Sequence, residues 1–177
     1  MRHRYAVLAA LPILASCSAG DSTAPDVSSL TRRSLTASQA VQVARPAGGR
    51  CDTDISFLPP QAGDPVNYLR MHIEYTCQLR HLGRTTATAE QLVIFTSPTT
   101  ALASNTTTFI AANGDLLYAT WTGTSTNAGP DIVFSGPETI VGGTGRFAGA
   151  TGSTWVTGTA SFVTNTGQFT SVGSITY

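Results

Sequence analysis

Apolar and polar residues alternate with a period of two along most of the chain after residue 50. The pattern is clearest in residues 69–79, where apolar side chains occupy the odd positions and mainly polar ones the even positions. Successive side chains of a β-strand point to opposite faces, so this segment predicts a strand with one buried and one solvated face. Further β-rich runs follow at 85–96, 106–112, 116–124, 132–134, 152–163 and 168–177.

Turn sequences separate these runs. Asn-Gly-Asp at 113–115 lies between two of them, and both Asn and Gly tolerate the positive φ angles of a tight hairpin. Asn-Thr-Gly at 165–167 supplies the last turn, and no run of ten residues after Cys51 has a helical period. The sequence therefore predicts an all-β fold, a small antiparallel β-barrel of about eight strands, with a β-sandwich as the alternative.

The N-terminus is organised differently. A cationic start precedes an apolar run at 5–14, which is too short to cross a bilayer as a helix but suits a signal peptide. The run ends in Leu-Ala-Ser-Cys at 14–17, which resembles the lipobox of bacterial lipoproteins. The resemblance implies that residues 1–16 are removed and that Cys17 carries a diacylglycerol thioether. A conventional cleavage site beside an incidental cysteine is the alternative.

Residues 17–50 are rich in Ser, Thr, Ala and Pro. This composition predicts a flexible linker, with a root-mean-square span of roughly 30 Å, between the lipid anchor and a domain at 51–177. The lipid makes the membrane the expected partner. By resemblance to enterobacterial sorting, Ser18 in place of Asp favours the outer membrane over the inner one.

Charge is sparse in this chain. Charged residues make up 11% of it, against about 25% in typical soluble domains, and every basic residue is arginine. From Cys51 onward, four arginines and eight carboxylates give a net charge of −4. An acidic domain without a basic stripe argues against nucleic-acid binding. No motif indicates a cofactor.

Two cysteines remain once Cys17 is lipidated. Cys51 and Cys77 form an even pair in an oxidising compartment, which predicts a disulfide. A bridge at this spacing contributes roughly 3.5 kcal/mol in the chain-entropy model. Two reduced thiols are the alternative. A metal site is not expected, because two cysteines at this spacing without clustered histidines do not make a ligand set.

Segment 142–152 is the most distinctive part of the domain. Its Gly-x-Gly-x-x-Ala spacing fits a dinucleotide fingerprint, but no helix follows and no acidic residue occurs after Glu138. We interpret the segment structurally: its glycines permit sharp bends, and the aromatic ring between them packs over one end of the barrel. The residues in this role are Gly142, Gly143, Gly145, Phe147, Gly149 and Gly152.

Three features resemble the allene oxide cyclase-like barrels, a superfamily that also holds the plant dirigent proteins. They are the hairpin at 109–115, the Gly-Gly-Thr-Gly-x-Phe-x-Gly-Ala-x-Gly block at 142–152 and the closing β-hairpin. The likeness covers about residues 106–177 and implies a barrel. In that superfamily, polar and aromatic residues lining the cavity steer a reactive intermediate. None of those positions transfers by motif to this chain, so no catalytic residue is predicted.

Four side chains are candidates for a polar lumen. Arg70, His72 and Glu74 share one face of the strand at 69–79, and His72 with Glu74 is an acid–base pair if that face lines the lumen. The alternation in hydropathy favours the other interpretation, a polar face in solvent. Tyr118 is the aromatic candidate, with core packing as its alternative role.

These patterns lead to one functional hypothesis and two alternatives. The hypothesis is a non-catalytic, lipid-anchored envelope barrel that binds a small apolar ligand or an envelope partner, since an eight-stranded barrel can just enclose one small ligand. The first alternative is a cyclase or isomerase that acts on a hydrophobic substrate in the lumen. The second is a structural or adhesive surface module.

Overall fold

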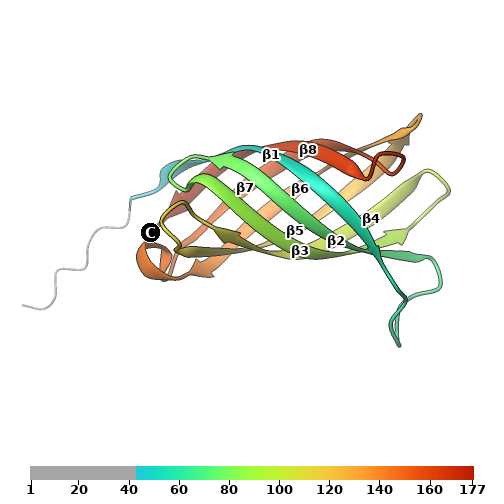
Figure 1. Cartoon of the computed structure of the whole chain (residues 1–177), viewed down its shortest axis with the longest axis horizontal. Coiled ribbons are helices and arrows are strands. Elements are labelled where there is room, and N and C mark those ends of the chain that lie inside the picture. Colours follow the sequence, from blue (N-terminus) through green and yellow to red (C-terminus); the bar gives the residue numbers. More distant parts are fainter. Residues whose placement is uncertain (1–42) are drawn as a thin grey trace, which may run out of the picture. The chain divides into compact units, whose positions relative to one another are not determined.

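A computed structural model of the chain describes residues 43–177. Eight antiparallel strands close into a barrel in sequence order, and the first strand pairs with the last (Figure 1). This confirms the predicted all-β barrel. The strands are β1 (Arg45–Leu58), β2 (Tyr68–Leu79), β3 (Gly83–Phe95), β4 (Thr100–Ile110), β5 (Leu116–Ala128), β6 (Asp131–Gly143), β7 (Thr151–Ser161) and β8 (Thr166–Thr176), with a short 3₁₀ helix, η1 (Gly145–Phe147), between β6 and β7.

The alternation along each strand separates the core from the solvent. In β2 the odd positions Met71, Ile73 and Tyr75 are buried inside the barrel, and the even positions between them face outward. The two predicted turns occur where the chain needs a left-handed backbone, with φ of 86° at Gly114 and 56° at Asn165. Local sequence therefore sets both the strand faces and the hairpins.

The predicted start of the domain at Cys51 is wrong. Strand β1 begins at Arg45, and residues that the sequence assigns to the linker pair with both β2 and β8. A Cβ atom at Gly48 would lie 2.0 Å from the carbonyl oxygen of Ser171, and one at Gly49 would lie 2.1 Å from that of Gln78. These glycines are part of the barrel because only a residue without a side chain fits so close to the neighbouring strands. The predicted signal peptide and Cys17 lie outside the described residues.

Strand β6 is much longer than the run predicted at 132–134. Gly136 and Pro137 interrupt its β-rich composition, which hides the strand in the sequence. The structure uses Gly136 for close packing, because a Cβ atom there would lie 2.1 Å from the carbonyl oxygen of Thr122 on β5. The strand therefore continues through a segment that propensity alone marks as a break.

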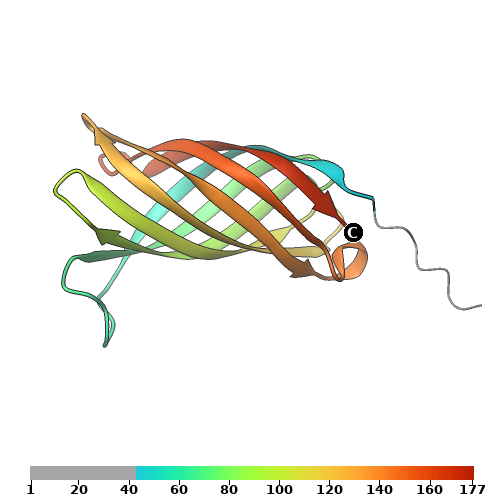
Figure 2. The same ribbon diagram turned by 180° about the vertical axis from the view of Figure 1, so that it is seen from behind.

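One end of the barrel, the sealed end, is closed by side chains and by η1. It carries the start of β1, the turns at 80–82 and 111–115, η1 and the C-terminus (Figure 2). Phe147 of η1 is fully buried, and its ring centroid lies 5.0 Å from that of Tyr177. Asp115 accepts a hydrogen bond from the backbone N–H of Arg146 at 3.1 Å, which ties η1 to the β4–β5 turn. The Gly-rich segment thus places an aromatic side chain over this end.

The predicted disulfide between Cys51 and Cys77 is confirmed. The two residues are direct partners on β1 and β2, with Cα atoms 4.0 Å apart, and both are buried. In residues 43–177, no helix has the length and apolar character required to span a membrane.

Candidate ligand-binding cavity

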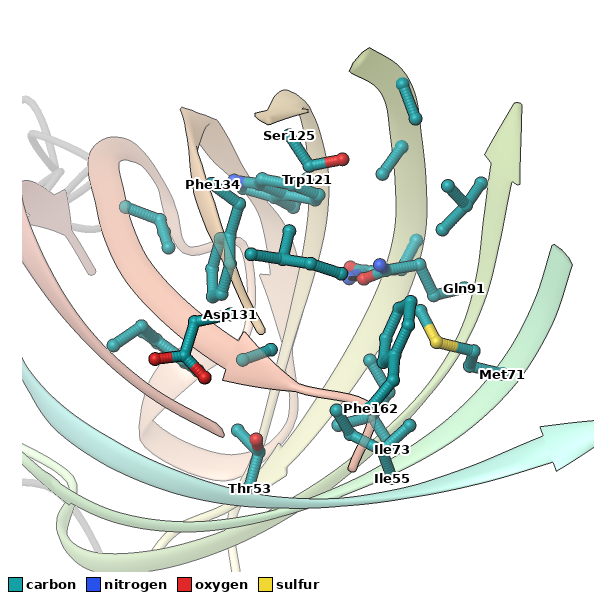
Figure 3. A pocket seen from close by; sticks show the side chains of 18 of the residues that line it. Thr53, Ile55, Met71, Ile73, Gln91, Trp121, Ser125, Asp131, Phe134 and Phe162 are labelled. Carbon is teal, nitrogen blue, oxygen red and sulfur yellow. Dashed lines mark hydrogen bonds between the residues drawn. The ribbon is translucent and has the colours of Figure 1, made fainter. Parts of the chain in front are cut away.

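The half of the barrel away from the sealed end contains a cavity of about 300 Å³. Figure 3 shows Trp121 and Phe134 on one side of it and Ile55, Ile73 and Met71 on the other. The space exists because several inward positions carry only a methyl group. These small positions are Ala101, Ala103 and Ala160.

The mouth of the cavity lies at the open end, which is the end formed by residues 59–67, 96–99, 129–130 and 162–165. Phe95 and Phe162 line the cavity near this end together with exposed residues of the β5–β6 turn. The backbone N–H of Asn127 donates to the carbonyl oxygen of Thr99 at 2.9 Å, which ties the β3–β4 turn to the end of β5. The cavity therefore opens among these turns and strand ends.

Three aromatic rings form the floor of the cavity. The ring centroid of Tyr75 lies 6.5 Å from that of Phe109 and 5.7 Å from that of Phe169. Below them, the sealed half retains only a void of about 30 Å³, which Phe109 and Phe169 also border. The floor thus divides a hollow half of the barrel from a filled half.

Glu138 is the acidic side chain at the floor. It is 9% exposed, borders both the cavity and the small void, and pairs in register with Trp121 on β5 and Thr154 on β7. The Thr154 hydroxyl donates to Glu138 Oε2 at 2.7 Å. Burial raises the pKa of Glu138, and the hydrogen bond from Thr154 opposes that rise.

The other carboxylate oxygen of Glu138 is accessible. Within residues 43–177, Oε1 has no hydrogen-bond partner, yet every fully buried side-chain polar atom there has one. Oε1 is therefore not fully buried, and the empty space that Glu138 borders is the cavity and the void beneath it. Oε1 is therefore a free acceptor at the boundary between the cavity and the void.

A row of uncharged polar groups runs along the wall formed by β3 and β4. The Asn105 amide donates to Gln91 Oε1 at 3.0 Å, and the Thr107 hydroxyl donates to Asn105 Oδ1 at 3.1 Å. Burial raises the pKa of the nearby Tyr75 hydroxyl, which keeps it protonated. The wall therefore offers hydrogen-bonding groups without a formal charge.

The structure corrects the predicted lumen residues. Arg70, His72 and Glu74 lie on the outer face of β2, and Tyr118 lies on the outer face of β5, between the buried Leu117 and Ala119. Arg70 forms an ion pair with Asp64 at 2.6 Å, and His72 lies 3.9 Å from Glu74 at the surface. The lumen interpretation is wrong because the apolar face of each strand, and not the polar one, closes inward.

The sequence analysis missed Glu138, the buried acid of β6. A signal for it exists: Ile132, Phe134 and Ile140 share its even parity on β6, so Glu138 is a carboxylate in an otherwise apolar alternation. The signal is invisible when the strand is predicted to end at residue 134. Of the two tryptophans, Trp121 lines the cavity, whereas Trp155 is 56% exposed on the outer face.

Comparisons with protein-family models, curated proteins and solved structures found no match. Among the described residues, no group of three or more His, Cys, Asp or Glu side chains is arranged to hold a metal ion. The chemistry of the site therefore depends on the side chains that line the cavity. Its apolar wall can bury hydrocarbon, and its floor can exchange hydrogen bonds with one polar group.

Proposed function

We propose that this chain is a lipid-anchored protein of the bacterial cell envelope whose barrel binds a small, largely apolar molecule. The observation that carries the proposal is the cavity of about 300 Å³, open at one end and walled by apolar side chains. Hollow interiors are uncommon in close-packed proteins, and a barrel of this strand number has room for one small ligand.

The size of the cavity suits a ligand of modest length. Each methylene moved from water into an apolar site gains about 0.8 kcal/mol, so a chain of eight carbons gains roughly 6 kcal/mol before the entropic cost of binding. Polar groups on the β3–β4 wall and at the floor then orient the molecule. Such a site is typical of binding proteins, in which a few polar groups sit in an apolar cleft.

The chain enters the barrel at the end opposite the cavity mouth. Strand β1 begins at the sealed end, so the segment that carries Cys17 joins the domain there, away from the cavity mouth. Lipidation at Cys17, location at the outer membrane and kinship with the allene oxide cyclase-like barrels are parts of the same proposal. Cys17→Ser should abolish palmitate labelling in cells and release the protein from membranes, and unchanged labelling would refute the anchor.

The proposed binding is tested with a neutral fluorescent hydrophobe, N-phenyl-1-naphthylamine, titrated into the full chain. Ala103→Trp fills the cavity from β4 and should weaken binding of the probe at least tenfold. Ser104→Trp is the matched control, because Ser104 is the next residue and points outward. Binding that survives Ala103→Trp, or that Ser104→Trp reduces equally, would contradict a lumen site.

The rival hypothesis of a lumen enzyme loses its main support. It required Arg70, His72 and Glu74 to face inward, and all three lie on the outer face of β2. The structural-module hypothesis predicts no cavity, whereas the barrel is hollow over half its length. Ligand binding is the function for which the geometry offers the most specific feature.

A further inference from the structure

In the described part of the chain, the cavity is lined by acidic side chains but by no basic ones. Of the described residues that line it, Glu138 and Asp131 carry carboxyl groups, and no Arg or His lines it. Glu138 lies at the floor, between the cavity and the small void. Asp131, which Figure 3 labels, is at the mouth at the start of β6. A molecule that enters therefore meets a carboxyl group first at the rim and again at the bottom.

Aromatic side chains surround the acid at the floor. Trp121 is its direct partner on β5, and Trp121 packs edge-on against Phe134 with centroids 6.0 Å apart. Phe109 and Phe169 border the same space as Glu138. The negative faces of aromatic rings attract cations, and aromatic cages recognise ammonium groups in this way.

The charged side chains on the outer surface are also distributed unequally between the two ends of the barrel. Arg45, Arg80, Arg84 and Arg146 are exposed at the sealed end, whereas exposed Asp54 and Asp131 lie toward the open end. Within residues 43–177, Arg70 is the arginine near the open end, and it is paired with Asp64. The electrostatic field of these surface charges attracts cations to the mouth and repels anions from it.

We infer that the ligand is a hydrophobic ammonium compound, whose charged nitrogen contacts Glu138 Oε1 among the floor aromatics while its hydrocarbon fills the space toward the mouth. This inference rests on the proposed function and specifies the ligand class. Thr154 holds one carboxylate oxygen in place, which leaves the other preorganised for the cation. A fatty acid of the same length is disfavoured, because its carboxylate would enter a site that holds two acids and no base.

The experiment uses three probes with the same chain: octylamine, octanol and octanoate. Each competes with N-phenyl-1-naphthylamine on the full chain at pH 7.5, where an alkyl amine, with a pKa of about 10, is protonated. Octylamine should displace the fluorophore at a concentration at least tenfold lower than octanol or octanoate. Equal or better displacement by octanol or by octanoate would overturn the inference.

Glu138→Gln tests the assigned residue at nearly constant shape. It should weaken octylamine binding at least tenfold and leave octanol binding within about twofold. Glu90→Gln, an exposed acid on the outer face of β3, is the control and should change neither. A preference for octylamine that persists in Glu138→Gln would refute the role of this carboxylate.

The two proposals fail in distinguishable ways. If the fluorophore does not bind the wild-type chain at all, the proposed binding function fails. If the fluorophore binds and octanol competes as well as octylamine, the cavity function stands and the ligand class is wrong. The ranking of the three probes on the wild-type chain decides the inference even if the Glu138→Gln chain does not fold.

Discussion

The two ends of this barrel are made by the same eight strands but filled very differently. At the sealed end, Phe147, Ile175 and the Cys51–Cys77 disulfide are almost completely buried, and only about 30 Å³ remains empty. At the open end, alanines at inward positions leave about 300 Å³. The contrast shows that the chain divides two tasks between its ends. Close packing in one half supports the barrel, and the other half keeps an empty space.

The ends also differ in how the connecting segments are used. At the sealed end, η1 is tied to the β4–β5 turn through Asp115, and the guanidinium of Arg146 lies 4.7 Å above the Phe147 ring. Arg146 also donates to the carbonyl oxygen of His81 in the β2–β3 turn. At the open end, turn residues bond to the ends of neighbouring strands, as Asn127 of β5 does with Thr99. We therefore expect stability to depend on the sealed end and binding on the open end.

The largest expected effect comes from Phe147. Phe147→Ala removes a fully buried ring and should lower the free energy of unfolding by about 3–5 kcal/mol, measured by urea denaturation. Phe95→Ala is the matched change at the open end, where the ring is partly exposed and lines the cavity. We expect this variant to lose less than about 1.5 kcal/mol. Equal losses would show that the two ends are not distinct in stability.

The disulfide should rank next. Cys51→Ser with Cys77→Ser removes a link between residues separated by 26 positions, which the chain-entropy model values at roughly 3.5 kcal/mol. Thermal unfolding of this double variant should occur at a clearly lower temperature than that of the oxidised wild type. Because the bridge borders the filled half, the affinity for N-phenyl-1-naphthylamine at 20 °C should stay within about threefold. A large loss of affinity would mean that the sealed end shapes the cavity directly.

The smallest expected effect is a pH dependence that distinguishes inner from outer acids. Burial raises the pKa of Glu138, so the native state holds this proton to a higher pH than the unfolded state, whose value is near 4.5. The contribution of Glu138 is therefore fully present below about pH 4.5 and is lost as the pH rises through the native pKa. Hydrogen bonding to Arg70 lowers the pKa of Asp64, so its contribution has the opposite sign and is lost as the pH falls below about 3.8.

Urea unfolding of wild type and Glu138→Gln across pH 4 to 8 measures this effect. The stability of Glu138→Gln relative to wild type should increase with pH above about 4.5. The control Glu90→Gln should run parallel to wild type over the same range. A Glu138→Gln curve parallel to wild type would mean that this carboxylate ionises as easily inside the barrel as in the unfolded chain.

Local sequence patterns were sufficient for β2 to β5, β7 and β8, for the two predicted turns and for the polar side of β2, but not for β1 or most of β6. Residues 69–79 alternate without interruption, and their burial follows the alternation. Asn-Gly at 113–114 made its turn predictable because few residues accept the backbone it requires. The pairing of Cys51 with Cys77 followed from their number and compartment. Each of these features depends on neighbouring residues in the sequence or on the number of cysteines.

The cavity and Glu138 could not be obtained in this way. Whether a barrel is filled depends on the summed volumes of inward side chains from all eight strands, and the alanines that leave room lie on different strands. Glu138 became visible only when β6 was seen to continue through Gly136 and Pro137. Its environment depends on Trp121 and Thr154, which contact it from the two neighbouring strands.

By itself, the sequence determined that this domain is built of strands with one apolar and one polar face, because the strand period is a local property of the backbone. It left a barrel and a sandwich as the two possible arrangements. Only the tertiary structure decided that the domain starts at Arg45, that one half is filled and the other hollow, and that a carboxylate lies at the floor. The physical reason is that closure brings together residues from distant parts of the chain, such as Cys51 and Phe169, which pair between β1 and β8. The space between such residues is a property of the assembled barrel and of no single strand.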